Sequence, residues 1–394
     1  MICDNSKKTE HLKISFYESI EAVNSDEWCG FVDNKNVYLS IPYLKVLEET
    51  LKEEVQPCYL LFHNSSNKLA AIAYFQFAKF IDQKSNIEDD ICLVQGIIKS
   101  KILKKIEAKM LVCGNIFACG EHGFLYSSEL SPSVAYSNFN RAIDQLKKTD
   151  KDKNFSIILM KEFWPETTVN GPMLVENNYS EFMIDVNMVL KIHPLWNDYN
   201  TYLQSMTTKF RTRANGVYKK SKSLVKKSFE VKDIRTYENR INELYGFVIN
   251  KADYNFGNIN AQAFKGFKEN LKENFRFTGY FLDEELIGFS TAMISNKKMD
   301  ANFVGLDYQY NSEYALYQRM LYDFVDLSIT ENLKELRLGR TAEEIKSCLG
   351  AKPIDMKLFI KHKNTVPNTI LKQMIKSVKP SEFVLRKPFK ANFI

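Results

Sequence analysis

The chain has 394 residues, more than one ordinary hydrophobic core holds, and this length predicts two or three domains. Hydrophobic residues make up 45% and charged residues 26%, the profile of a soluble globular protein. The net charge of +6 permits an anionic ligand without implying nucleic acid. Seven scattered cysteines with no CxxC pair argue against a disulfide framework and a zinc ribbon, so we expect no metal.

Residues 1–11 are polar and are predicted to be a flexible N-terminus without a signal peptide. No stretch approaches the roughly 18 apolar residues that a membrane helix needs. We therefore expect a cytoplasmic protein with reduced thiols and no transmembrane segment. The oligomeric state stays open.

The elements begin with a strand-like run at 12–20 and a helix at 41–51 that has apolar residues on one face. A hairpin follows, "CYLLFH", "NSSNK" and "LAAIAYFQF", and residues 278–294 echo it as "TGYFL", "DEE" and "LIGFSTAMI". After each hairpin comes a predicted helix and then a short buried strand. We expect that final strand to lie parallel to a neighbour across a helical crossover.

This internal repeat predicts two α/β domains of one architecture, with the first copy carrying a longer insert between hairpin and helix. The predicted boundaries are 12–190 for the first domain, 191–235 for a linking region and 236–394 for the second domain. From Lys209 to Lys227 the linking region has eight basic residues and no acidic one. Apolar residues at helical spacing predict a helix over 209–227 with a basic exposed face.

Several strings resemble the tandem-GNAT arrangement of FemAB-like proteins and of BioF2-like acetyltransferases. They are "KFRTRANGVYKKSKS", "FTGYFLDEELIGFSTAMI", "NFVGLDYQYNSEYALYQRMLYDFVDLSI", "GRTAEEIKSCLGAKP" and "LVCGN…GEHGF". The resemblance spans roughly residues 15 to 390. It implies an α/β fold with mixed sheets, namely two tandem GNAT-like domains joined by the basic helix. It also implies an N-acyltransferase that moves an acyl or aminoacyl group to an amine by direct attack.

The chain departs from the GNAT pattern where acyl-CoA enzymes cradle pyrophosphate. That cradle is a glycine-rich loop at the start of the crossover helix, where backbone N–H groups and the helix dipole attract an anion. Neither "ELSPSVAYSNFN" nor "DYQYNSEYALYQRM" contains a glycine. Acyl-CoA, an acyl-carrier protein and aminoacyl-tRNA therefore all remain possible co-substrates, and we expect no permanently bound cofactor. The acceptor is expected to be a small-molecule or peptide amine.

GNAT-type transfer needs a backbone N–H that polarises the donor carbonyl and a side chain or water that accepts the amine's proton. Asp307 is a candidate base because it follows the strand before the second crossover helix, although it could equally cap that strand's end. The remaining donor- and substrate-binding candidates are basic or polar residues near the expected cleft: Asn115, Arg211, Arg213, Tyr308, Arg319, Arg340 and Lys346. Solvated helix faces are the competing interpretation for the arginines and lysines.

The string "LVCGNIFACGEHGF" at 111–124 suggests a cysteine or metal site. However, "KMLVCGN" is typical of a strand in which Cys113 is a small buried hydrophobe, and a fourth metal ligand is missing. We interpret the stretch as a glycine-shaped loop, either purely structural or lining a cleft, with His122 and Glu121 as further candidate proton acceptors.

Two alternatives to an acyltransferase stay open. One is a non-catalytic FemAB-like recognition protein that binds a cell-wall precursor or another anionic ligand. The other is an RNA-binding accessory protein that works through the basic helix. If residues 113–122 and 340–346 line one cavity, the enzyme hypothesis gains most.

Overall fold

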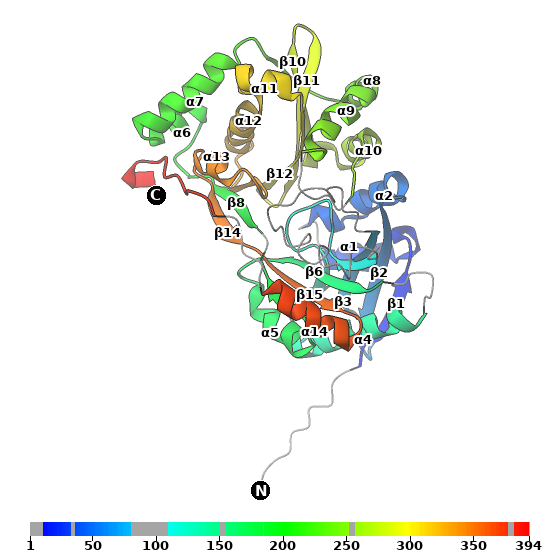
Figure 1. The fold of residues 1–394 in the computed structure, drawn as a ribbon. Coiled ribbons are helices and arrows are strands. Elements are labelled where there is room, and N and C mark those ends of the chain that lie inside the picture. The colour runs from blue at the N-terminus through cyan, green and yellow to red at the C-terminus, as the bar shows by residue number, and fades with distance from the viewer. Residues whose placement is uncertain are drawn as a thin grey trace.

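The computed structural model describes residues 11–32, 36–79, 109–149, 155–183, 185–251, 257–376 and 382–393. Residues 1–10 of the predicted flexible N-terminus lie outside these ranges, as does much of the insert after the first hairpin. Two mixed sheets, each with helices against it, form the two halves of the molecule (Figure 1).

The first sheet has the order β1-β2-β3-β4-β6-β15-β7, with β5 paired to β3. Its strands are β1 (Lys13–Tyr17), β2 (Val55–His63), β3 (Leu69–Lys79), β4 (Lys109–Cys113), β5 (Phe124–Tyr126), β6 (Ile157–Phe163), β7 (Ser180–Phe182) and β15 (Lys357–His362). Its helices are α1 (Ser25–Val32), α2 (Ile41–Thr50), α4 (Pro132–Thr149), α5 (Gly171–Glu176) and α14 (Thr365–Ile375).

The second sheet has the order β14-β8-β13-β12-β11-β10-β9. Its strands are β8 (Val186–Lys191), β9 (Val225–Ser228), β10 (Phe275–Leu282), β11 (Glu285–Ser295), β12 (Lys298–Leu306), β13 (Glu335–Arg337) and β14 (Lys352–Asp355). Its helices are α6 (Tyr199–Ser205), α7 (Thr208–Lys220), α8 (Val231–Thr236), α9 (Glu238–Ile249), α10 (Ala261–Leu271), α11 (Tyr308–Tyr314), α12 (Leu316–Thr330) and α13 (Glu343–Ser347).

The predicted repeat is confirmed. Hairpins β2–β3 and β10–β11 are antiparallel, and the crossover helices α4 and α12 lead to strands that lie parallel to an earlier one. These parallel pairs are β4 with β6 and β12 with β13. The fold is therefore the α/β arrangement with mixed sheets that the sequence predicts.

The two halves exchange a strand. β8 follows the first half in sequence but lies between β13 and β14, and β15 follows the second half but lies between β6 and β7. Sheet membership thus crosses the predicted boundaries at 190 and 236. Each sheet is completed by a segment from beyond the other.

One hydrophobic core also spans the halves. Helix α2 packs against α10, where the rings of Tyr43 and Phe267 stack 4.8 Å apart, and a Cβ at Gly266 would lie 2.9 Å from Val46. Buried residues of both sheets join this cluster. The opposite face of the first sheet packs against α4 in a separate cluster that includes Phe75 and Phe139.

The exchange predicts that residues 1–185 alone do not form a stable domain. They lack β15, whose Phe359 is fully buried, and loss of one buried Phe costs about 3–5 kcal/mol against a total stability of about 5–15 kcal/mol. Circular dichroism of the fragment should show no cooperative thermal transition. Appending residues 356–376 through a flexible linker should restore one. Cooperative unfolding of the unextended fragment would contradict the prediction.

Candidate functional site

A gap opens in the second sheet where β13 ends. β12 and β13 pair only from Lys298 with Glu335 to Asp300 with Arg337, while β12 continues to Leu306 beside β11. Because β13 is only three residues long, the next six residues of β12 have no neighbour from β13. The chain after β13 bends away over 338–341 and leaves an open notch.

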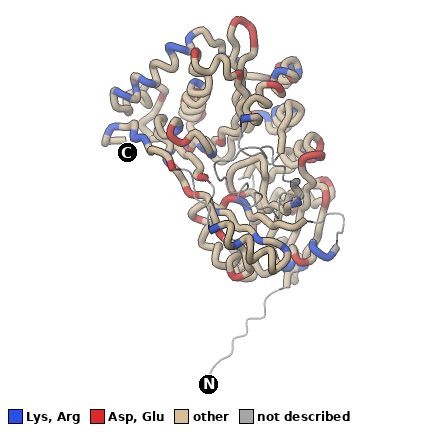
Figure 2. Tube along the Cα trace, viewed as in Figure 1, with Lys and Arg blue, Asp and Glu red and all other residues tan. Residues whose placement is uncertain are grey.

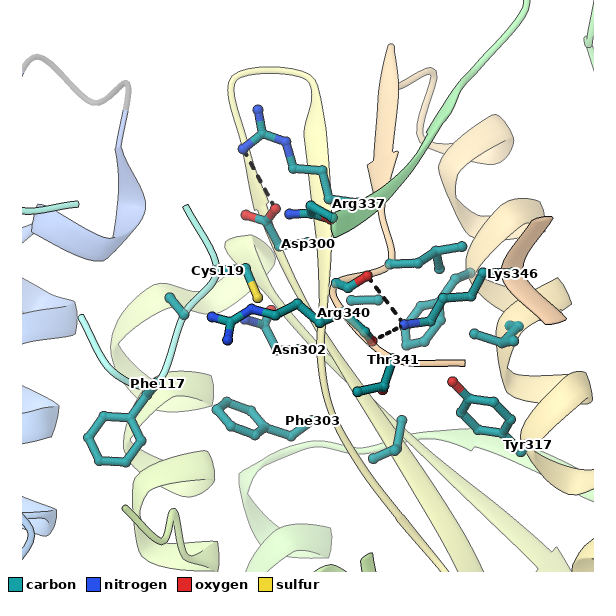
Figure 3. A pocket seen from close by; sticks show the side chains of 18 of the residues that line it. Phe117, Cys119, Asp300, Asn302, Phe303, Tyr317, Arg337, Arg340, Thr341 and Lys346 are labelled. Carbon is teal, nitrogen blue, oxygen red and sulfur yellow. Dashed lines mark hydrogen bonds and ion pairs between the residues drawn. The ribbon is translucent and has the colours of Figure 1, made fainter. Parts of the chain in front are cut away.

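A pocket of about 320 Å³ occupies this notch. One wall is β12, a second is the turn after β13, and the first turns of α12 and the side of α9 close it (Figure 3). The loop at 116–119 of the first half completes the lining. The lining residues are Ile116, Phe117, Ala118, Cys119, Asn187, Tyr245, Gly257, Asp300, Ala301, Asn302, Phe303, Val304, Tyr317, Leu321, Phe324, Arg337, Leu338, Gly339, Arg340, Thr341 and Lys346. Parts of 113–122 and of 340–346 therefore line one cavity.

A bulge in β6 holds the first-half loop in place. The pairing of β6 with β15 shifts register near Lys161 and Glu162, and Glu162 has a left-handed φ of 55°. The Lys161 ammonium donates to the Ala118 carbonyl, and the Gly120 N–H donates to a carboxylate oxygen of Glu162 at 2.6 Å. A Cβ at Gly114, where φ is 127°, would lie 3.1 Å from the Lys161 Cβ. The glycine thus lets the loop turn close against β6.

Ionic contacts join this loop to the second half. Arg340 forms an ion pair with the buried carboxylate of Glu162, and Glu162 lies 3.4 Å from the Lys161 ammonium. Burial, together with Arg340, lowers the pKa of Lys161 to about 7. Burial also lowers the pKa of Lys346 to about 8, and its ammonium donates to the carbonyls of Gly339 and Arg340.

A hydrogen-bond chain across the halves ends at Asp300, a partly buried carboxyl in the pocket wall. The Asn302 amide donates to the Tyr38 hydroxyl at 2.9 Å, and that hydroxyl donates to Asp300 at 3.0 Å. Burial raises the pKa of Asp300 to about 6, although Arg337 at 3.8 Å and the Tyr38 hydrogen bond act in the opposite direction. A carboxyl that changes charge near neutral pH inside a pocket is suited to accepting a proton.

The first-half candidates lie beside the pocket rather than in its wall. The His122 ring lies 4.4 Å from that of Tyr38, its Nε2 is 2.9 Å from the Cys119 carbonyl, and burial lowers its pKa to about 3. Burial raises the pKa of Glu121 to about 7, against a hydrogen bond with Thr167. The Asn115 amide donates to the Tyr43 hydroxyl at 2.8 Å and accepts from the Phe117 N–H.

Three second-half candidates belong to other contacts. Asp307 caps α11 by accepting from the Gln309 N–H and pairs with Arg240 at 3.1 Å, so it occupies the capping position considered above. The Tyr308 ring lies under the Lys251 ammonium. Arg319 pairs with Asp323 at 3.0 Å and donates to Ser221, on the side of α12 that faces α7.

The basic segment is helical only in part. α7 ends at Lys220, and residues 225–228 form β9 against β10, so the predicted helix over 209–227 is wrong beyond Ser221. The reason is that Leu224 is buried in a cluster with Tyr280, which draws the chain into the sheet. Arg213 donates to the Cys348 sulfur, and Arg211 lies one turn from the start of α7. Basic residues recur along α7 (Figure 2), and Lys209, Lys219 and Lys220 among them are exposed.

Of the candidate residues, Arg340 and Lys346 line the pocket, whereas sequence reasoning assigned no role to Asp300 and Asn187. Asp300 lies within β12, so a search for polar residues that follow strands does not find it. The signal that would have identified it is the brevity of β13, which opens the gap beside it. Asn187 comes from β8, whose place in the second sheet is not visible in the order of elements.

The N-termini of both crossover helices carry partners from the chain itself. The Val134 N–H at the start of α4 donates to the Ser131 hydroxyl, and the Tyr317 N–H in the first turn of α12 donates to the Asn311 side chain at 2.9 Å. These N–H groups are the ones that would bind pyrophosphate in a glycine-rich loop. The missing glycines thus coincide with occupied helix starts.

Within the described ranges, no group of three His, Cys, Asp or Glu side chains could hold a metal ion. The helices in these ranges are all too short or too polar to cross a bilayer.

Comparison with solved structures identifies the fold. FemX has a TM-score of 0.53 at 8% identity, and the match covers 92% of this chain and 100% of FemX. A tandem GNAT protein from the clavulanic acid biosynthesis pathway also has a TM-score of 0.53, at 9% identity, covering 90% of this chain and 99% of that one. L-PGS from Bacillus licheniformis has a TM-score of 0.51 at 10% identity, covering 90% and 98%. No protein-family model and no curated protein matches the sequence.

These likenesses span both halves of the chain and nearly the whole of each structure. The chain therefore has a two-domain, tandem-GNAT-like fold, which confirms the fold that the sequence resemblance implies.

The partly buried Asp300 predicts a pH-dependent stability difference. Its pKa in the folded chain, about 6, exceeds the ordinary 3.8, so ionisation destabilises the fold increasingly as pH rises through this window. Relative to Asp300→Asn, the wild type should lose about 1.4 kcal/mol of unfolding free energy between pH 5 and pH 8. Urea denaturation at both pH values measures this loss.

Asp355→Asn is the control, because Asp355 is exposed at the end of β14. Equal pH dependence in the wild type and in Asp300→Asn would show that Asp300 has no raised pKa.

Proposed function

We propose that the protein is an acyltransferase of the GNAT and FemAB-like type. The observation that carries the proposal is the notch between β12 and β13, which brings a backbone N–H, a partly buried carboxyl and two cations into one pocket. The tandem-GNAT-like fold supports it, since FemX, L-PGS and the tandem GNAT protein share that fold. In this function an acyl or aminoacyl group passes to an amine by direct attack.

The proposed polarising group is the N–H of Val304. The N–H groups of a strand alternate in direction, and those of Phe303 and Asp307 are directed towards β11, where they donate to Thr291 and Ile287. The N–H of Val304 is therefore directed into the notch. A donor carbonyl bound there would receive a hydrogen bond that strengthens as negative charge develops on its oxygen.

The proposed base is Asp300. Above pH 6 it is mainly a carboxylate, and the Tyr38 hydroxyl fixes one of its oxygens. The amine attacks the donor carbonyl and Asp300 accepts the proton that the amine loses. The C–S or C–O bond to the carrier then breaks, and Asp300 returns this proton to the leaving thiolate or alkoxide. Lys346 and Arg340 place positive charge beside the developing oxyanion.

The donor proposed here is carried by a polyanionic macromolecule, an acyl-carrier protein or a tRNA, rather than by free CoA. In the first turn of each crossover helix one N–H group, that of Val134 or Tyr317, already has an acceptor within the chain, which weakens the usual site for pyrophosphate. The basic outer face of α7 instead suits an extended anionic surface. An amine on a small molecule or a peptide is the acceptor.

Labelled acyl-CoA, acyl-carrier protein and aminoacyl-tRNA, each incubated with a panel of amines, test the function. We expect transfer from one of the two macromolecular donors, with kcat/KM rising to a plateau above an apparent pKa near 6. Asp300→Asn should reduce kcat by about 10²–10⁴-fold because the base is lost.

Asp307→Asn is the matched comparison, since it alters a carboxylate that directly follows β12 and caps α11 outside the pocket. It should keep the pH profile. A rate loss with Asp307→Asn but not with Asp300→Asn would reverse the assignment. Binding of a donor without turnover would favour the non-catalytic recognition protein instead.

Direct attack also predicts a particular behaviour of Cys119, the half-buried thiol in the pocket wall. Alkylation with N-ethylmaleimide should abolish transfer by filling the pocket. Cys119→Ser should retain most of the rate and be insensitive to the reagent at this site, because no acyl group passes through the thiol. Exposed Cys29 reacts in both proteins and serves as the labelling control. An inactive, folded Cys119→Ser would instead indicate a thioester intermediate, which mass spectrometry of the intact chain would detect.

A further inference from the structure

Two asparagines border the notch with hydrogen-bonding atoms that no described residue satisfies. Asn187 is 1% exposed, and both its Nδ2 and its Oδ1 have no partner. The Oδ1 of Asn302 also has none, while its Nδ2 donates to Tyr38. An unpartnered buried polar atom typically costs about 1–3 kcal/mol, so three in one pocket indicate that something else binds there.

The positions of the two side chains follow from the sheet. β13 lies between β12 and β8, and it ends at Arg337. Beyond that point, Asn302 stands on β12 and Asn187 on β8, and the Gly339 carbonyl accepts from the N–H of Met188, next to Asn187. The Leu338 N–H in turn donates to the Met188 carbonyl, so the gap lies between this turn and β12, and both asparagines line the pocket.

The unpartnered atoms define a chemistry. They offer two acceptor oxygens and one amide donor. The group that carries one N–H donor and one C=O acceptor in a short planar unit is a secondary amide. Charge is not needed for this contact, because neither asparagine is ionisable.

We propose that Asn187 and Asn302 form a recognition site for a secondary amide in the bound substrate. The proposal rests on the notch being the substrate pocket of the proposed function and adds the class of substrate that it takes. The amide N–H donates to an asparagine oxygen, and the amide carbonyl accepts from the Asn187 Nδ2. Such an amide occurs both in a pantetheine arm and in a peptide, and the experiment distinguishes these sources.

Saturation-transfer NMR with the full chain measures weak binding of three probes: pantetheine, acetyl-Ala-Ala-methylamide, and the analogue of this peptide with an ester in place of the Ala-Ala amide. The ester should bind roughly tenfold more weakly than the peptide, because it has lost one N–H donor. Preference for pantetheine would identify a carrier arm as the source of the amide, and preference for the peptide would identify a peptide substrate. Equal binding of peptide and ester, with no pantetheine binding, would overturn the proposal.

Asn187→Leu provides a second and independent measurement. Removing two unsatisfied polar atoms should raise Tm by about 2–4 °C while abolishing binding of the amide probes. Asn115→Leu is the matched control, because Asn115 is equally buried but both its amide atoms are hydrogen-bonded, so its Tm should fall. A fall in Tm for Asn187→Leu with unchanged probe binding would show that Asn187 is a structural residue.

The binding measurements do not depend on turnover. Amide-selective binding without transfer from any donor would retain this inference and reject the acyltransferase. If Asn187→Leu transfers as well as the wild type, from amide and ester substrates alike, the acyltransferase is retained and this inference is rejected.

Discussion

The exchange of β8 and β15 is the constraint on which the rest of the structure depends. In the first sheet β15 pairs with both β6 and β7, and in the second sheet β8 pairs with both β13 and β14. Each of these joining strands comes from beyond the other half in the sequence, so neither half completes its hydrogen-bond ladder alone. The shared core between α2 and α10 adds a second tie. Together they fix the loop at 116–119 against the turn at 338–341, and the pocket exists only because these two segments meet.

Burial explains why the ionisable groups between the two halves differ from the same groups in water. Glu162 and Lys161 are buried and Asp300 is partly buried, and an isolated buried charge is costly unless paired. Arg340 compensates Glu162 across the junction, while Asp300 has only Tyr38 close by and Arg337 at 3.8 Å. Glu162, whose charge is compensated by Arg340, thus holds the halves together. Asp300 is less well compensated, and its pKa is raised to about 6, where it can exchange protons.

The sequence predicted the elements that depend on neighbouring residues and missed the features that depend on contacts between distant ones. Hairpins, crossover helices and the glycine-shaped loop depend on turn residues and on periodicity within a few residues, so their patterns predict them. The end of the basic helix at Lys220 depends on the burial of Leu224 by residues some sixty positions away. The local sequence pattern does not indicate that contact. Asp300 and Asn187 belong to the site because a strand stops early and another is exchanged. Arg340 and Lys346 were found because they directly follow that short strand.

The occupied N-termini of the crossover helices and the unpartnered asparagines both bear on where a donor would bind. To bind pyrophosphate at α12, the protein would have to release the Asn311 side chain from the Tyr317 N–H, and the exchange of one acceptor for another yields little net free energy. Binding at the unpartnered atoms of Asn187 and Asn302 breaks no hydrogen bond with any described residue. In the proposed function, the free energy for holding a donor would therefore come from the notch, near the reacting carbonyl, rather than from the phosphates. A donor whose carrier is replaced while its amide is kept should still be recognised.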